Sequence, residues 1–138
     1  MIQTTKTLDW DKYLKTAAQV VSEGIVMLKN EHQALPLKPH EEIALFGRIQ
    51  FHYYKSGTGS GGMVNVSKVT NIVDGLQESG IKLNQELLDV YHKWDNENPF
   101  DLGDGWGKEP WSQKEMPLED SLAARAAKRC QTAIAVIG

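Results

Sequence analysis

Two short apolar runs that each end in glycine constrain the fold of this chain more than any other feature. They are residues 43–47 (IALFG) and residues 133–138 (AIAVIG). Continuous apolar runs of this length are typical of strands in a parallel sheet, because such strands are covered on both faces. The covering layers are normally helices, so the two runs predict an α/β fold.

The remaining sequence supplies elements for such a fold. Apolar residues recur at spacings of three and four from Trp10 to Leu28, the stripe of a helix lying on a core. We predict helices at residues 10–30, 69–79, 85–94 and 118–130, and a further strand at residues 81–83. This order is typical of a three-layer αβα sandwich with a mostly parallel sheet, flavodoxin-like or Rossmann-like. Because few strands are present and no helix follows the last one, we expect the domain to be truncated.

Two long loops, residues 48–68 and 95–117, interrupt these elements, and loops of this length are usually functional. The first contains Gly57, Gly59 and Gly62 in the pattern GxGxxG. The dinucleotide fingerprint needs these glycines directly after a strand and at the start of a helix, which is not the case here. Three interpretations remain open: nucleotide binding, a structural loop, and a loop whose bare backbone closely approaches another molecule or domain.

Composition excludes several classes of function. The 15 Lys and Arg against 18 Asp and Glu give a net charge of −3, which does not favour nucleic-acid binding. The sequence has neither a signal-peptide core nor an apolar stretch of about 20 residues, so we expect a cytoplasmic protein without a membrane partner.

Few side chains in the sequence suggest chemistry by themselves. The single cysteine, Cys130, falls on the apolar face of a predicted helix, where a buried inert thiol is expected. The histidines lack metal-ligand spacing, so we expect surface or loop histidines, no metal and no cofactor; they are His32, His40, His52 and His92. The second loop carries many carboxylates, but a solvated acidic loop explains them. The residues alone indicate no catalytic group.

Several segments resemble glycoside hydrolase family 3. Residues 18–37 (AQVVSEGIVMLKNEHQALPL) resemble the opening of that family's α/β sandwich domain, and residues 43–47 its first strand. Residues 57–65 (GTGSGGMVN) resemble its GSGSG-type loop, and residues 126–138 a helix and strand of the form AAxxxDxAIVVIG. The Arg48-x-Gln50 pair and residues 105–120 are similar to the bacterial β-glucosidase branch.

This resemblance implies a retaining, exo-acting β-glycosidase that hydrolyses terminal β-linked sugars. The family places a nucleophilic Asp on a companion (β/α)₈ barrel and an acid/base Glu on a sandwich-domain loop. That loop follows the strand that ends here at Gly138. We therefore expect residues 1–138 to be part of the sandwich domain, without the barrel, without either catalytic residue and inactive alone. The start at Met1 suggests the reversed domain order of some bacterial members.

The resemblance also implies a substrate site. The expected ligand is a β-linked glycoside or oligosaccharide, and the expected intramolecular partner is the barrel. The residues expected to line or support the sugar-binding mouth are Arg48, Tyr54, Ser60, Gly61, Gly62, Met63 and Asn65. Met63 stands where some relatives carry an aromatic residue. Two alternatives are a stand-alone nucleotide-binding module and a non-catalytic carbohydrate-binding or interaction module.

Overall fold

The computed structural model describes residues 7–53, 65–105 and 107–137. The chain divides into two compact units, Met1–Pro36 and Leu37–Gly138. No helix among the described residues is long and apolar enough to cross a membrane.

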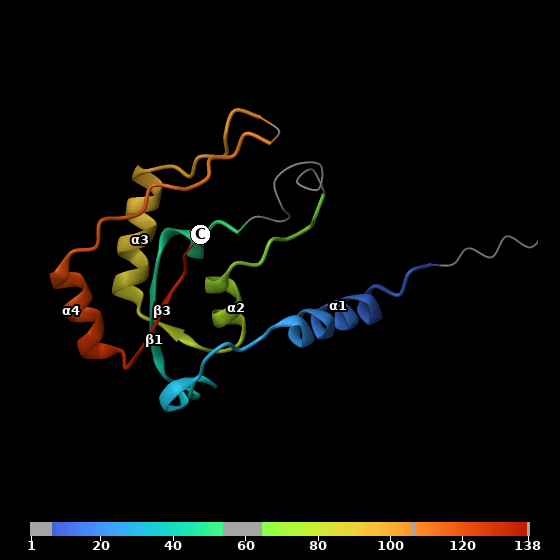
Figure 1. Ribbon diagram of the computed structural model, residues 1–138, viewed down its shortest axis with the longest axis horizontal. Coiled ribbons are helices and arrows are strands. Elements are labelled where there is room, and N and C mark those ends of the chain that lie inside the picture. The colour runs from blue at the N-terminus through green and yellow to red at the C-terminus, as the bar shows by residue number, and fades with distance from the viewer. Residues whose placement is uncertain (1–6, 54–64, 106, 138) are drawn as a thin grey trace, which may run out of the picture. The chain divides into compact units, whose positions relative to one another are not determined.

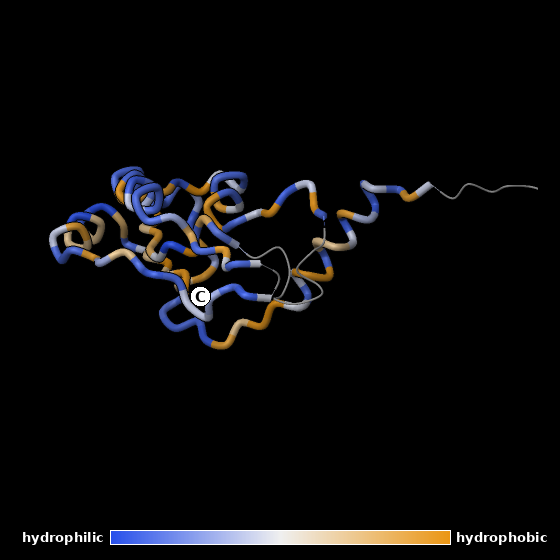
Figure 2. Tube along the Cα trace, turned by 90° about the horizontal axis from the view of Figure 1, so that it is seen from above, coloured by the Kyte–Doolittle hydropathy of each residue, from blue (hydrophilic) through white to orange (hydrophobic). Residues whose placement is uncertain are grey.

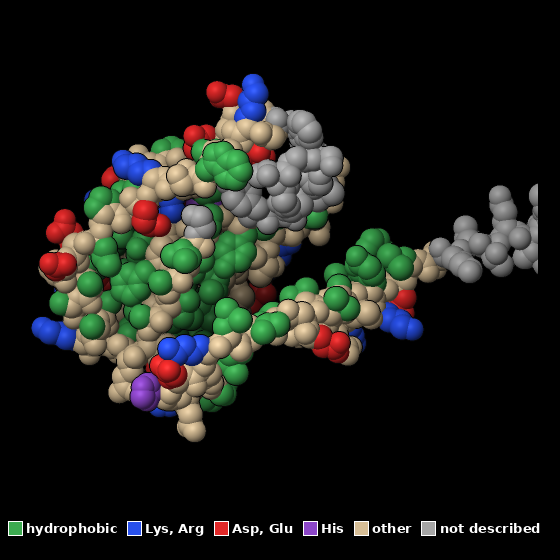
Figure 3. Space-filling model, viewed as in Figure 1, with side chains coloured by type: hydrophobic (Ala, Val, Ile, Leu, Met, Phe, Trp, Pro, Cys, Tyr) green, Lys and Arg blue, Asp and Glu red, His purple; other side chains and the backbone are tan. Residues whose placement is uncertain are grey.

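The first unit contains one regular helix, α1 (Trp10–Gly24). Asp9 caps its start, because its carboxylate accepts a hydrogen bond of 3.0 Å from the Lys12 N–H. The helix ends at Gly24, since Ile25 is extended, so it is shorter than the predicted helix at residues 10–30. The predicted apolar stripe is present: hydrophobic and hydrophilic residues alternate along the trace of α1 (Figure 2), and hydrophobic side chains gather along it in the space-filling view (Figure 3). It does not lie on a core, because no residue of α1 is buried.

The second unit is built on a parallel sheet of three strands: β1 (Glu42–Phe46), β2 (Lys82–Leu83) and β3 (Thr132–Ala135). The strand order is β2-β1-β3. Ile43 pairs with Leu83 on one side and with Thr132 on the other. All three predicted strands are therefore confirmed, and the strand richest in buried residues is central.

Helices cover both faces of this sheet (Figure 1). On one face, α3 (Gln85–Glu97) and α4 (Asp120–Arg129) pack on Ala44 of β1 through a cluster that includes Leu87, Tyr91 and Leu122. On the other face, α2 (Ile72–Glu78) packs on Leu45 through Val73. The alternation of side chains along β1 sends Ala44 and Leu45 to opposite layers. The predicted αβα sandwich is confirmed.

The helix boundaries follow their caps more than their hydrophobic pattern. The predicted helix at residues 69–79 begins only at Ile72. Asn71 caps it, because its side-chain oxygen Oδ1 accepts a hydrogen bond of 2.8 Å from the Asp74 N–H. In the same way, Asn84 caps α3 by accepting from Leu87 N–H at 3.0 Å. This helix continues to Glu97 rather than ending at the predicted residue 94.

Candidate functional site

The carboxyl edge of the sheet carries the best-connected polar residues of the second unit. The chain leaves β1 through Gly47 and makes a 3-10 turn, Arg48–Gln50. The Arg48 N–H donates to the Glu115 carboxylate, with 2.9 Å from the nitrogen to Oε2. This bond joins the end of β1 to the loop between α3 and α4. Ligands of open parallel sheets bind at this edge, outside the carboxyl ends of the strands.

The buried guanidinium of Arg48 binds both arms of that loop. Its Nη1 donates to the Lys114 carbonyl at 3.0 Å, and its Nη2 donates to the Asn98 carbonyl at 2.7 Å. Nη2 also donates to Asp95 Oδ1 at 2.6 Å, while the Arg48 Cζ lies 4.9 Å from the centroid of the Trp94 ring. A planar, charged fork with five N–H donors suits this multiple role. Arg48 therefore supports the loop from within.

Asp95 also binds His52, which extends this network to the surface. The distance from His52 Nε2 to Asp95 Oδ2 is 2.7 Å. Since a carboxylate only accepts, Nε2 is the nitrogen that donates. The His52 ring also stacks on the Phe100 ring, with 4.6 Å between the two centroids. Both oxygens of Asp95 are thus engaged by cations or N–H donors.

Two cavities border the His52 and Phe100 rings. One, of about 200 Å³, is lined by Phe51, His52, Tyr53, Val69, Phe100 and Leu102. The other, of about 420 Å³, shares His52, Phe100 and Leu102 with the first. Ligand sites of this size are commonly apolar with a few placed polar groups. Residues from both long loops therefore form one groove, which we call the His52–Phe100 groove.

The structure describes only part of the expected sugar-binding mouth. Arg48 is 2% exposed, so its polar atoms face the protein interior. Asn65 is exposed. The other expected residues, together with the GxGxxG glycines, lie outside the described residues: Tyr54, Ser60, Gly61, Gly62 and Met63.

Sequence reasoning missed the pairing of His52 with Asp95. His52 is a loop histidine, as predicted, but its side chain, 32% exposed, also hydrogen-bonds to Asp95. No local pattern signals this contact, because 43 residues separate the two partners. The aromatic residues at positions 51–54 were the only available hint, and they indicate packing as readily as a site.

Burial raises the pKa of several groups in the second unit. Burial raises the pKa of the Cys130 thiol, although a hydrogen bond from Asn84 partly offsets this effect. Cys130 is buried, in agreement with the expected inert thiol. Burial likewise raises the pKa of Tyr53, so its hydroxyl is protonated at neutral pH. Among the described residues, no group of three His, Cys, Asp or Glu side chains is placed to hold a metal ion.

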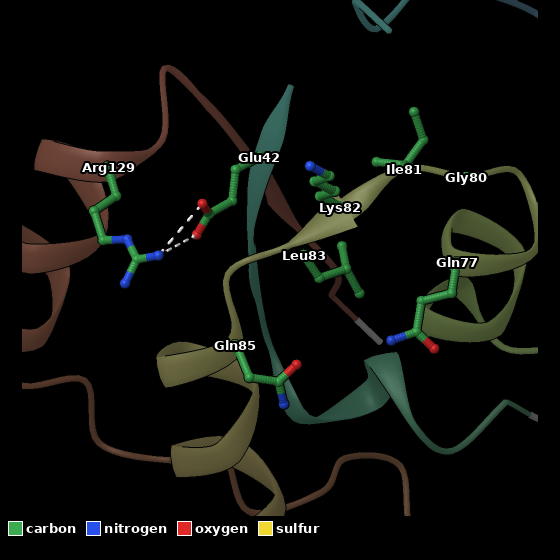
Figure 4. Close-up of a pocket in the computed structure, with 8 residues that line it drawn as sticks. All are labelled: Glu42, Gln77, Gly80, Ile81, Lys82, Leu83, Gln85 and Arg129. Carbon is green, nitrogen blue, oxygen red and sulfur yellow. Dashed lines mark hydrogen bonds and ion pairs between the residues drawn. The ribbon is translucent and has the colours of Figure 1, made fainter. Parts of the chain in front are cut away.

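A second hollow, of about 440 Å³, lies at the other end of the strands (Figure 4). Its walls include Glu42 at the start of β1, and Lys82 and Leu83 of β2. Arg129 closes one side through an ion pair of 3.3 Å with Glu42. This hollow lies by the amino end of β1, away from the edge where parallel sheets bind ligands. The His52–Phe100 groove is therefore the better candidate.

These features define an α/β sandwich domain with a candidate ligand groove at the carboxyl edge of its sheet. Residues 25–138 match the family described as the glycosyl hydrolase family 3 C-terminal domain, and the chain belongs to this family. A β-glucosidase of Ruminococcus albus is 57% identical over 131 residues, which are 95% of this chain and 14% of that protein. Beta-glucosidase A of Butyrivibrio fibrisolvens is 32% identical over 91% of this chain and 15% of its own length.

Solved structures show the same relationship. A β-glucosidase from Paenibacillus barengoltzii superposes with a TM-score of 0.86 at 48% identity, covering 93% of this chain and 14% of that one. Beta-glucosidase 3B from Thermotoga neapolitana, solved in complex with glucose, gives a TM-score of 0.80 at 29% identity, covering 96% of this chain and 18% of that one. The chain thus spans about a seventh of the length of the curated relatives it matches.

Proposed function

We propose that this chain is part of the sandwich domain of a β-glucosidase that removes terminal β-linked sugars with retention of configuration. The observation that carries the proposal is the 57% identity to the Ruminococcus albus β-glucosidase over 95% of this chain. In this proposal the (β/α)₈ barrel is a separate domain of the intact protein. The partners are that barrel and a β-linked glycoside or oligosaccharide.

The catalytic pair is proposed to lie outside this chain. Retention needs two carboxyl groups about 5–5.5 Å apart, one as nucleophile and one as acid and base. Two carboxylates of this network already accept hydrogen bonds: Asp95 from Arg48 and His52, and Glu115 from the backbone N–H groups of Arg48 and Met116. These contacts assign both carboxylates a supporting role, and neither is proposed as the nucleophile or the acid and base.

The chain is proposed to contribute binding and support instead. The glycine-rich loop, with Ser60, Gly61, Gly62, Met63 and Asn65, would line the sugar-binding mouth. Tyr54 would assist it. Arg48 would act from beneath, since it holds the loop between α3 and α4.

An aryl β-glucoside assay on two proteins tests this proposal. We expect the intact protein that contains this chain to release the aryl alcohol, and the 138-residue chain alone to release none. The anomer of the first sugar released, followed by NMR, reports retention. Turnover by the isolated chain, or no turnover of common β-glycosides by the intact protein, would contradict the proposal.

A further inference from the structure

The chain contains two Asp-Gly pairs, and the structure places them in opposite surroundings. One pair is Asp74–Gly75 and the other is Asp104–Gly105. In such a pair the backbone nitrogen of the glycine can attack the carboxyl group of the preceding side chain, because glycine has no side chain to obstruct the approach. The attack needs a backbone that can bring the two reacting atoms together. The fold therefore determines which pair reacts.

Helix α2 holds the Asp74–Gly75 pair in place. The Asp74 N–H donates to the Asn71 side chain at 2.8 Å, and the Gly75 N–H donates to the Asn71 carbonyl at 3.0 Å. Both residues of the pair are half-buried. The Gly75 nitrogen can attack the Asp74 carboxyl only after the first turn of the helix has opened, and local opening of a helix costs free energy. Helix α2 therefore protects this pair.

The Asp104–Gly105 pair lies outside regular secondary structure, in the loop between α3 and α4 (Figure 1). Both residues are exposed, and nothing lies within 4 Å of the position that a Cβ on Gly105 would take. Among the described residues, none accepts a hydrogen bond from the Gly105 N–H. No helix has to open before the Gly105 nitrogen can move, so this pair lacks the protection that α2 provides.

Two hydrogen bonds separate this pair from the contacts of Arg48. The Asp101 N–H donates to Gln113 Oε1 at 3.0 Å, and Gln113 Nε2 donates to the Asp101 carbonyl at 2.7 Å. Residues 102–112 lie between these two partners along the chain, and we call them the loop tip. The Lys114 carbonyl that binds Arg48 comes after them. A change in the backbone of the loop tip therefore leaves the contacts of Arg48 in place.

We propose that Asp104–Gly105 is a site of spontaneous covalent modification, at which Asp104 converts to isoaspartate, and that Asp74–Gly75 is protected in the folded protein. The Gly105 nitrogen loses its proton and bonds to Asp104 Cγ, while one carboxyl oxygen leaves as water and a succinimide ring forms. A water molecule then adds to either ring carbonyl, and the bond from that carbonyl carbon to the ring nitrogen breaks. Since one water leaves and one enters, the mass is unchanged and no oxidant or reductant is needed.

Opening of the ring at the main-chain carbonyl carbon of Asp104 gives the isoaspartate. The main chain then runs through Cβ and Cγ, and the former main-chain carbonyl becomes a free carboxylate. This lengthens the backbone of the loop tip by one methylene group and keeps the net charge. The modification therefore changes the shape of the loop tip without changing its charge.

Water enriched in heavy oxygen tests the proposal on the intact protein that contains this chain. Each cycle of ring formation and opening inserts one heavy oxygen atom at the aspartate that reacts. After transfer to ordinary water, trypsin releases residues 69–82 with the first pair and residues 94–108 with the second. We expect residues 94–108 to take up label at least about tenfold faster than residues 69–82 at neutral pH. Fragmentation in the mass spectrometer should locate the label and the isoaspartate at position 104.

Denaturation and two variants are the controls. In denaturant neither pair has a fixed structure, so both peptides should take up label at similar rates. Asp104→Glu keeps the carboxylate but lengthens the side chain, which disfavours ring closure, so it should abolish uptake at position 104. Asn71→Ala removes the cap of α2, and it should raise uptake at Asp74 about three- to tenfold in the folded protein.

The outcomes are decisive because mass is measured and β-glucosidase activity is not needed. Equal uptake by the two peptides in the folded protein, or uptake at Asp104 only after denaturation, would overturn the proposal. Label at position 104 without isoaspartate would contradict the proposed product. Unchanged uptake at Asp74 in Asn71→Ala would contradict the protection by α2.

Discussion

Arg48 connects the end of β1 to the two arms of the loop between α3 and α4. Its side chain is 3% exposed, and Asp95, its ion-pair partner, is 14% exposed. Breaking a buried pair by removing one partner leaves the other charge uncompensated, which costs about 3–5 kcal/mol. An exposed pair costs much less, because water screens both charges.

Arg48→Met tests this difference. We expect it to lower the free energy of unfolding by about 3 kcal/mol or more in urea denaturation, since Asp95 and two loop carbonyls lose their donor. The matched control is Arg125→Met, because Arg125 forms an exposed pair of 2.7 Å with Glu86. It should cost about 1 kcal/mol or less.

A double variant then isolates the ion pair. If Asp95 is the main group left uncompensated, Asp95→Asn added to Arg48→Met should recover part of the lost stability. Equal losses for Arg48→Met and Arg125→Met would show that the Arg48 network does not hold the loop.

At the scale of secondary-structure elements, Gly47 determines how β1 ends beside β3. Its φ is +98°, and a Cβ on this residue would lie 2.0 Å from the Val136 carbonyl oxygen. Only glycine permits both that conformation and that approach. The hydrogen bond from Val136 N–H to the Phe46 carbonyl, 2.9 Å, depends on the same closeness.

Gly47→Ala should therefore be much more costly than the same substitution at another glycine with positive φ. Gly80 provides the comparison, because its φ is +76° and nothing lies within 4 Å of its Cβ position. We expect Gly80→Ala to cost about 1 kcal/mol from backbone strain alone and Gly47→Ala about 3 kcal/mol or more, measured by thermal or urea unfolding. Similar losses for the two variants would mean that β3 can move away from Gly47 freely.

The caps of α2 and α3 allow a second comparison between elements. Both are asparagines that accept one backbone N–H. The half-buried Asn71 also donates one long hydrogen bond of 3.4 Å to the Phe51 carbonyl, whereas the buried Asn84 donates to Glu42 at 3.0 Å and to the Cys130 sulfur at 3.5 Å.

Asn71→Ala should cost about 1 kcal/mol, the usual value for a cap, and Asn84→Ala about 2 kcal/mol or more, because its partners also lose their donor. Urea denaturation measures both values. A loss at Asn84 no greater than at Asn71 would show that Asn84 acts as a cap only.

At the scale of the whole molecule, burial makes the second unit sensitive to alkaline pH. Burial raises the pKa of Tyr91, an effect that a hydrogen bond with the Gly47 backbone partly offsets, and it raises the pKa of Cys130. Above the ordinary pKa of these groups, the unfolded chain releases protons that the folded chain still holds. Folding stability therefore falls as the pH rises.

We expect the free energy of unfolding contributed by these groups to be constant up to about pH 8.5 and to decline above it. Urea denaturation at pH 7.0, 8.5 and 10.0 measures the decline. Tyr91→Phe removes one titrating group, so its decline between pH 8.5 and 10.0 should be shallower than that of the wild type. An unchanged slope in Tyr91→Phe would contradict the assignment of Tyr91.

Local patterns predicted most of the elements, because each depends on neighbouring residues. The apolar run at residues 43–47 became β1, shifted by one residue, and the helices predicted at residues 85–94 and 118–130 are α3, which ends three residues later, and α4. The helix starting at Trp10 was predicted too long. Its apolar spacing continues past Gly24, but the backbone leaves the helical conformation at Ile25. Periodicity reports which face is apolar, but the cap and the backbone determine where a helix stops.

The sequence by itself determined the αβα architecture and, through segments such as residues 18–37, the resemblance to glycoside hydrolase family 3. Only the tertiary structure decided that Arg48, His52, Asp95 and Phe100 form one network beside a groove. The physical reason is distance along the chain. The Arg48 and Asp95 positions are 47 residues apart, and the His52 and Asp95 positions 43. The hydrophobic pattern of a segment indicates which of its own residues share a face. The contacts of Asp95 with Arg48 and His52 arise only because the parallel sheet brings separate loops to the same edge.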